Sequence, residues 1–132
     1  MRWAGGDKFD GLSKFGLPIS TDAQREGAPD PQGYSPPQLI LFGVIGCTGI
    51  DVVRLLEKMR QKLISLEIEA TGIQPDEYPK PFTTVSLTYR FKGENLDPER
   101  VKRALSLSHD KYCMVSQTLA ENTEIKYDFE IA

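Results

Sequence analysis

The stretch Leu39–Arg60 constrains this chain more than any other. As far as Ile50 it consists almost entirely of apolar and small residues, so a helix there would be apolar on every face. From Asp51 onward the apolar residues recur at helical spacing opposite charged ones. A double proline beginning at Pro36 suits a helix start, because proline lacks the N–H that the first turn leaves unpaired. We therefore predict a long central helix over residues 36–64 whose first half is buried on all sides.

The size of the chain and the order of its patterns predict the fold class. At 132 residues the chain has enough length for one domain, residues 1–132, with one modest core. Strands, helices and a last strand in this order predict an α+β fold in which the helices pack on antiparallel sheet. One small sheet cannot cover the apolar half of the central helix, so we expect a homodimer. The expected segments are N-terminal strands in 1–22, a loop in 23–35, the helix in 36–64, and strands, two helices and a C-terminal strand in 65–132.

Alternation and capping patterns place the later elements. Apolar and polar residues alternate in Leu66–Ile73, Phe82–Phe91 and Ile125–Ile131, the period of a strand with one wet face. Asp97 followed by a proline and an acid predicts a helix over Pro98–His109. A second short helix is expected over residues 111–120.

Charge and hydropathy narrow the class of protein. The net charge is -3 and no run of basic residues occurs, so we expect no nucleic-acid partner. The wholly apolar run is about a dozen residues, shorter than the roughly 20 that cross a bilayer, and no signal-like segment opens the chain. We expect no membrane partner and a cytoplasmic protein.

The two cysteines, Cys47 and Cys113, are the residues best suited to chemistry. In a cytosolic chain they are expected as thiols rather than as a structural disulfide. A buried cysteine is most often an inert small hydrophobe, whereas a reactive one needs a stabilised thiolate. If the helix is continuous, Cys47 lies far from its positive end; if the glycines break it near Gly46, Cys47 would lie in a first turn. The residue pattern leaves both alternatives open, as it does the distance between the sulfurs.

Three polar residues are candidates for supporting roles. Asp51 and Arg54 lie on the Cys47 face of the helix, where the arginine would favour an anion and the aspartate would oppose one. His109, the only histidine, is a candidate base, although a lone histidine at a helix end is usually a capping or surface residue. No zinc-ligand spacing and no glycine-rich phosphate loop occur, so we expect no metal and no cofactor.

Several motifs, spread over nearly the whole chain, resemble the OsmC/Ohr superfamily, and within it most closely the YhfA-like OsmC branch. They are Gly46-Cys-Thr-Gly-Ile-Asp-Val-Val53, Lys58-Met-Arg-Gln61, Tyr78-Pro-Lys-Pro-Phe-Thr83, Val101-Lys-Arg-Ala-Leu-Ser-Leu-Ser108 and Lys111-Tyr-Cys113. The resemblance implies an OsmC-like fold in an intertwined homodimer with two active sites at the interface.

The same resemblance implies a thiol-dependent peroxidase for organic hydroperoxides. By analogy, Cys47 attacks the peroxide, Cys113 resolves the sulfenic acid to a disulfide, and an external dithiol reduces that disulfide. Characterised peroxidases of the superfamily also use a glutamate before the first cysteine and an arginine from the N-terminal strands. Here the matching stretch, Ser35-Pro-Pro-Gln-Leu39, has no acid. The alternative is therefore a non-catalytic OsmC-like stress protein that binds a small apolar ligand at the dimer interface.

Overall fold

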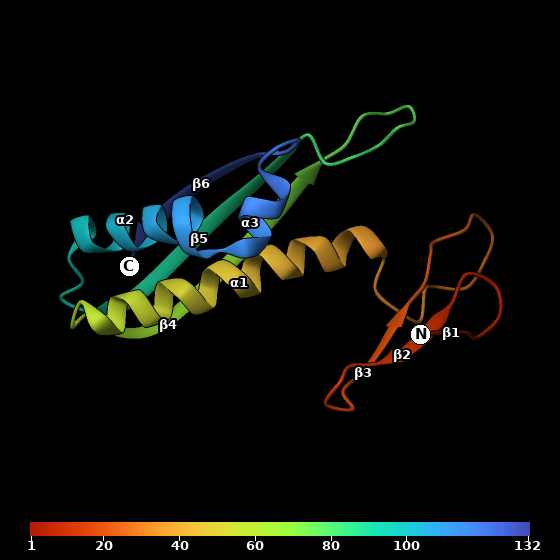
Figure 1. Cartoon of the computed structure of the whole chain (residues 1–132), viewed down its shortest axis with the longest axis horizontal. Helices are drawn as coiled ribbons and strands as arrows, with labels where there is room; N and C mark the ends of the chain where they lie inside the picture. Colours follow the sequence, from red (N-terminus) through yellow and green to blue (C-terminus); the bar gives the residue numbers. More distant parts are fainter. The chain divides into compact units, whose positions relative to one another are not determined.

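The computed structural model describes residues 1–132, which divide into two compact units, Met1–Ile40 and Leu41–Ala132 (Figure 1). The helix α1, Pro36–Lys58, begins in the first unit and continues into the second. The expectation that residues 1–132 form one domain stays a prediction.

The first unit is a three-stranded antiparallel meander of short strands. Its strands are β1 (Arg2–Trp3), β2 (Phe9–Leu12) and β3 (Pro18–Thr21), with β2 in the centre. A turn closed by the Ser13 N–H and the Leu17 carbonyl precedes β3, and all three strands lie within the predicted range of residues 1–22. The Asp22 side chain holds the loop that follows, because it accepts hydrogen bonds from the backbone N–H groups of Ala23 and Gln32.

The helix α1 begins with a reciprocal capping box. The Gln38 N–H donates to Ser35 Oγ at 3.4 Å, and the Ser35 N–H donates to Gln38 Oε1 at 3.1 Å. The helix is continuous through its glycines, which rules out the predicted alternative of a break near Gly46. Its predicted end at 64 is wrong: α1 ends at Lys58, Arg60 turns the chain with a φ of 58°, and the next residues enter a strand.

One stripe of α1 is buried in the single chain. Its members are four residues apart, the spacing that places side chains on one helix face: Val44, Thr48, Val52 and Leu56. Phe42 and Ile50, on other faces, are 52% and 54% exposed, so burial on all sides is not achieved within one chain.

The second unit is built on a three-stranded sheet, with β5 (Thr84–Glu94) between β4 (Lys62–Ile73) and β6 (Glu124–Ile131). The strands β4 and β5 are antiparallel, as predicted, whereas β6 runs parallel to β5. The expectation of a wholly antiparallel sheet is therefore wrong. The helical connection after β5 carries the chain back to the starting end of that strand, which lets β6 run in the same direction.

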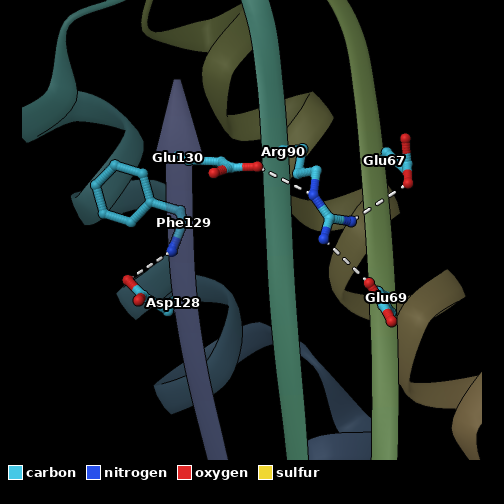
Figure 2. Close-up of polar contacts among 6 residues, drawn as sticks. All are labelled: Glu67, Glu69, Arg90, Asp128, Phe129 and Glu130. Carbon is cyan, nitrogen blue, oxygen red and sulfur yellow. Dashed lines mark hydrogen bonds and ion pairs between the residues drawn. The ribbon is translucent and has the colours of Figure 1, made fainter. Parts of the chain in front are cut away.

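The two faces of this sheet differ sharply. The β5 residues that point toward the helices are almost completely buried and form much of the core: Val85, Leu87, Tyr89 and Phe91. On the opposite face Arg90 lies among three carboxylates, with ion pairs to Glu67 at 3.3 Å, Glu69 at 3.1 Å and Glu130 at 3.0 Å (Figure 2). The three carboxylate side chains are all more than 60% exposed, so the acidic face is open to solvent in the single chain.

The connection between β5 and β6 contains three helical segments. The helix α2 (Pro98–Leu107) begins at its predicted cap, where Asp97 accepts the Glu99 N–H at 3.0 Å. It continues as a π-helical turn, Ser108–Tyr112, and the short α3 spans Met114–Leu119. The predicted helix over 111–120 is therefore shorter than expected, and Cys113 lies before it in extended backbone.

Candidate functional site: a thiol pair beside a carboxylate

The structure brings the two predicted cysteines together. Both are free thiols, Cys47 partly exposed on α1 and Cys113 fully buried between the π-helical turn and α3. The sulfur atoms and a carboxylate oxygen of Asp51 all lie within 4.8 Å of one another. Residues from the central helix and from the β5–β6 connection therefore form one cluster.

The first turn of α3 supplies N–H groups to both sulfurs. The Ser116 N–H donates to Cys113 Sγ at 3.3 Å, so Cys113 caps α3 with its side chain. The Val115 backbone N–H acts on the other sulfur and lowers the pKa of the Cys47 thiol. Because the two donors are consecutive residues, the start of α3 fixes the positions of both thiols.

The surroundings of Cys47 oppose its ionisation. Burial raises the pKa of the Cys47 thiol, and the hydrogen bond to Cys113 and the charges of Cys113 and Asp51 raise it further. Only the Val115 N–H acts in the other direction. The continuous α1 gives little help, because Cys47 lies well inside the helix and far from its positive end. Arg54, predicted as a possible support for the anion, is exposed and does not contribute to this shift.

Asp51 is held by a contact from the second helical segment. Ser108 Oγ donates to Asp51 Oδ2 at 3.3 Å. Ser108 is fully buried, and this contact joins the π-helical turn to α1. The sequence placed Asp51 correctly on the Cys47 face of the helix but gave no sign of Ser108.

A buried chain of hydrogen bonds lies next to the thiols. Thr48 Oγ1 donates to the Val44 carbonyl at 3.0 Å, and Tyr89 Oη donates to Thr48 Oγ1 at 2.8 Å. With its proton used in this way, Tyr89 Oη accepts from His109 Nε2 at 2.9 Å. His109 Nδ1 is then left as the acceptor for Ser116 Oγ at 3.4 Å.

His109 is a buried member of this chain, not the surface or capping residue that its position suggested. It is 8% exposed and stacks on the Tyr127 ring with 4.3 Å between centroids. Burial lowers the pKa of His109, which keeps the ring neutral as the hydrogen-bond order requires. Burial likewise raises the pKa of Tyr89, so its hydroxyl stays protonated.

The hydrogen-bond chain links all the elements that carry the cysteines. Thr48 follows Cys47 on α1, and Ser116 is the residue whose N–H binds Cys113. Sequence reasoning missed Tyr89, because an inward tyrosine on an alternating strand looks like any other core residue. The available signal was a tyrosine at an inward-facing position of the strand, since a buried tyrosine hydroxyl needs a hydrogen-bond partner.

These features define an α+β protein with a thiol pair between its central helix and a helical crossover, and comparison with known proteins gives its family. The OsmC-like protein model matches residues 28–128. Protein YhfA of Escherichia coli K12 is 33% identical over 131 residues, which cover 99% of this chain and 95% of YhfA. The chain belongs to the OsmC-like protein family.

Solved structures share the fold. A hypothetical protein from Aquifex aeolicus has a TM-score of 0.87 at 24% identity, covering 99% of this chain and 92% of that one. The organic hydroperoxide resistance protein OhrB of Bacillus subtilis has a TM-score of 0.65 at 19% identity, covering 96% and 93%. One of these structural neighbours is therefore named for hydroperoxide resistance.

Family membership also explains the apolar character of α1. By length and composition alone this 23-residue helix would suffice to cross a membrane. Its buried stripe instead packs in the core of an OsmC-like fold with the sheet residues of β5. We therefore describe α1 as the core helix of a soluble fold.

Proposed function

We propose that this protein is a cytoplasmic, thiol-dependent peroxidase that reduces organic hydroperoxides in oxidative or osmotic stress. The observation that carries the proposal is the contact between the Cys47 and Cys113 thiols, whose sulfurs lie within 4.8 Å of each other. Two free thiols at this separation suit a cycle that passes through a disulfide, because only a small movement is needed for bonding.

Exposure assigns the two roles. Cys47 is partly exposed and Cys113 is fully buried, so a hydroperoxide meets Cys47 first. The Cys47 thiolate attacks the peroxide oxygen, the O–O bond breaks, and the alkoxide takes a proton to leave as an alcohol. Cys47 is then a sulfenic acid. The Cys113 thiol displaces its hydroxyl as water and forms the disulfide, which an external dithiol reduces.

The raised pKa of Cys47 and the missing family glutamate bear on the rate of the first step. Gln38, at the start of α1, is engaged in the capping box with Ser35. We infer that the Val115 N–H is the group that stabilises the Cys47 thiolate in the single chain.

A homodimer is part of the proposal. Ile50 and Val53 are 54% and 42% exposed on α1, and Ile64 is 63% exposed on β4. Exposed apolar residues gathered on neighbouring elements support an interface with a second copy of the chain.

Stopped-flow consumption of cumene hydroperoxide with a dithiol tests the proposal. Cys47→Ser should remove essentially all consumption, whereas Cys113→Ser should still form a sulfenic acid that a dimedone probe traps. Glu57→Gln, an exposed change on α1, is the control expected to leave the rate unchanged. Equal consumption by wild type and Cys47→Ser would overturn the proposal.

A second candidate, binding of a small apolar ligand without turnover, is favoured by one observation. A groove of about 330 Å³ between α1 and β4 is lined almost wholly by apolar residues: Ile45, Gly46, Gly49, Ile50, Val53, Leu66 and Ile68. For such a protein Cys47→Ser would retain ligand binding, and the wild type would consume no peroxide.

A further inference from the structure

The thiol pair and Asp51 are three metal-ligand groups, two of them on α1 and the third, Cys113, on the β5–β6 connection. Their ligand atoms lie within 4.8 Å of one another. A zinc ion holds thiolate sulfur at about 2.3 Å and carboxylate oxygen at about 2.0–2.2 Å, so atoms bound to one ion lie roughly 3–4 Å apart. The cluster needs only a slight contraction to reach that arrangement.

No cation of the chain balances these three groups. Arg54 is exposed and forms no ion pair, and Lys111 Nζ lies over the Tyr112 ring at 5.2 Å from its centroid. His109 is neutral in the buried chain, with Nε2 bonded to Tyr89. Two thiolates and a carboxylate would therefore repel one another unless a positive ion binds among them.

Each of the three groups has a neighbour that orients it. The Ser116 N–H donates to Cys113 and Ser108 Oγ to Asp51, and the Val115 N–H lowers the pKa of the Cys47 thiol. Such outer contacts are characteristic of built metal sites, where they hold the ligands in place. The partly exposed side of Cys47 provides the route of entry.

We propose that Cys47, Cys113 and Asp51 bind a borderline-soft divalent cation, with Zn²⁺ as the ion that suits two sulfurs and one oxygen. Binding exchanges the two thiol protons, which pass to solvent, for two sulfur–metal bonds. Three protein ligands leave a fourth position for water. Sequence spacing did not indicate this site, because Cys113 joins the other two ligands only through the fold.

The proposal goes beyond the peroxidase function and does not depend on it. It has one consequence for that function: the loaded protein has no free thiolate, so a bound cation would block reaction with hydroperoxides. Peroxide reactivity and metal binding then exclude each other at the same pair of sulfurs.

Cobalt titration of the reduced full-length chain tests the site, with no peroxide present. The wild type should bind one Co²⁺ per chain with thiolate-to-cobalt charge-transfer absorption, and Zn²⁺ should displace it. Cys47→Ser and Cys113→Ser should each remove most of this absorption. Asp51→Asn keeps an acceptor for Ser108 and should weaken binding by at least about tenfold, since even outer contacts are worth 10- to 100-fold.

Glu57→Gln on the exposed face of α1 is the matched control and should bind like the wild type. Absence of the charge-transfer band in the wild type, or equal affinity in Asp51→Asn, would overturn the proposal.

A second measurement uses only the wild type, in case a variant fails to fold. Zn²⁺ should slow alkylation of Cys47, whereas Mg²⁺, which prefers oxygen ligands, should not. Equal alkylation rates with and without Zn²⁺ would also overturn the site. Cobalt binding without hydroperoxide consumption would overturn only the peroxidase proposal. Hydroperoxide consumption without cobalt binding would overturn only the metal site.

Discussion

The two units of the chain achieve order by different means. Every apolar residue of the buried core belongs to the second unit, between Val44 and Cys113. In the first unit, Trp3, Leu12 and Phe15 are 68%, 73% and 79% exposed, and the strands are held by backbone pairing and polar turns. A short meander without a core has little stability of its own. The difference teaches that the first unit needs a covering surface, which the proposed homodimer would provide.

The largest expected effect comes from the same substitution made once in each unit. Leu56→Ala, at a position with no exposed surface, should lower the free energy of unfolding by about 2–5 kcal/mol through lost burial and a residual cavity. Leu12→Ala, at a 73% exposed position, should change it by no more than about 0.5 kcal/mol in dilute protein. Urea unfolding measures both.

Protein concentration sharpens this comparison. If a second copy covers the first unit, the cost of Leu12→Ala should grow with concentration, because dimer formation is linked to stability. A cost that is large at every concentration would mean that the first unit buries Leu12 without a partner.

The next effect concerns the hydrogen-bond chain of the second unit. Tyr89→Phe removes one hydroxyl and leaves Thr48 and His109 without their buried partner, so it should cost about 1–3 kcal/mol. Thermal unfolding followed by circular dichroism measures the loss. Tyr78→Phe, at an 89% exposed position, is the matched control. Similar results for the two variants would contradict the role given to the chain.

A smaller effect is expected at a glycine of α1. A Cβ at Gly46 would meet nothing within 4 Å, whereas at Gly49 it would lie 3.1 Å from Ile68 Cδ1. Gly46→Ala should therefore raise the stability of the single chain by up to about 1 kcal/mol through helix propensity, and Gly49→Ala should not. Sedimentation should show weaker self-association of Gly46→Ala if that face packs closely against a second copy; unchanged association would remove Gly46 from the interface.

The smallest effect is a pH dependence arising from His109. Burial lowers its pKa in the folded chain below the reference value of 6.5. Between the folded and the reference pKa the unfolded chain binds a proton that the folded chain does not, so stability falls as pH decreases through that interval. Tyr89, Tyr127 and Asp110 are the titratable groups around the ring, and only the Asp110 charge favours its protonation.

Unfolding measured from pH 7.5 to 4.5 in wild type and His109→Gln isolates this contribution. Titrating carboxylates affect the stability of both proteins and cancel in the comparison. The free energy of unfolding of the wild type minus that of His109→Gln should therefore decline on acidification and level off above the reference pKa. A difference that is constant with pH would show that His109 does not titrate differently on folding.

The sequence predicted the local elements better than their assembly. The start of α1, the antiparallel pair β4–β5 and the cap at Asp97 follow from local patterns, and the structure confirms them. The parallel direction of β6 was missed, because alternation identifies a strand but not the direction of its neighbour. The end of α1 was misplaced, because the basic residues that suit a helix end continue to Lys62, whereas the backbone has already turned at Arg60.

The candidate site was predictable in its parts. Cys47 and Cys113 were identified, and Asp51 was placed on the correct helix face. Their meeting depends on the packing of the β5–β6 connection against α1, which no spacing reveals. The ionic surroundings, with a carboxylate and no cationic side chain beside the thiols, likewise emerge only in three dimensions.

The parallel pairing of β6 has a consequence for the time at which the thiols meet. A parallel neighbour cannot form by a tight hairpin, so the whole segment from α2 to α3, which carries Cys113, must settle before β6 joins the sheet. A nascent chain that has made α1 and the β4–β5 hairpin still presents Cys47 alone. We therefore expect the sulfur pair to mature late, and pulsed alkylation during refolding should label Cys47 until the segment from α2 to α3 settles. Protection of Cys47 while that segment is still unfolded would contradict this order.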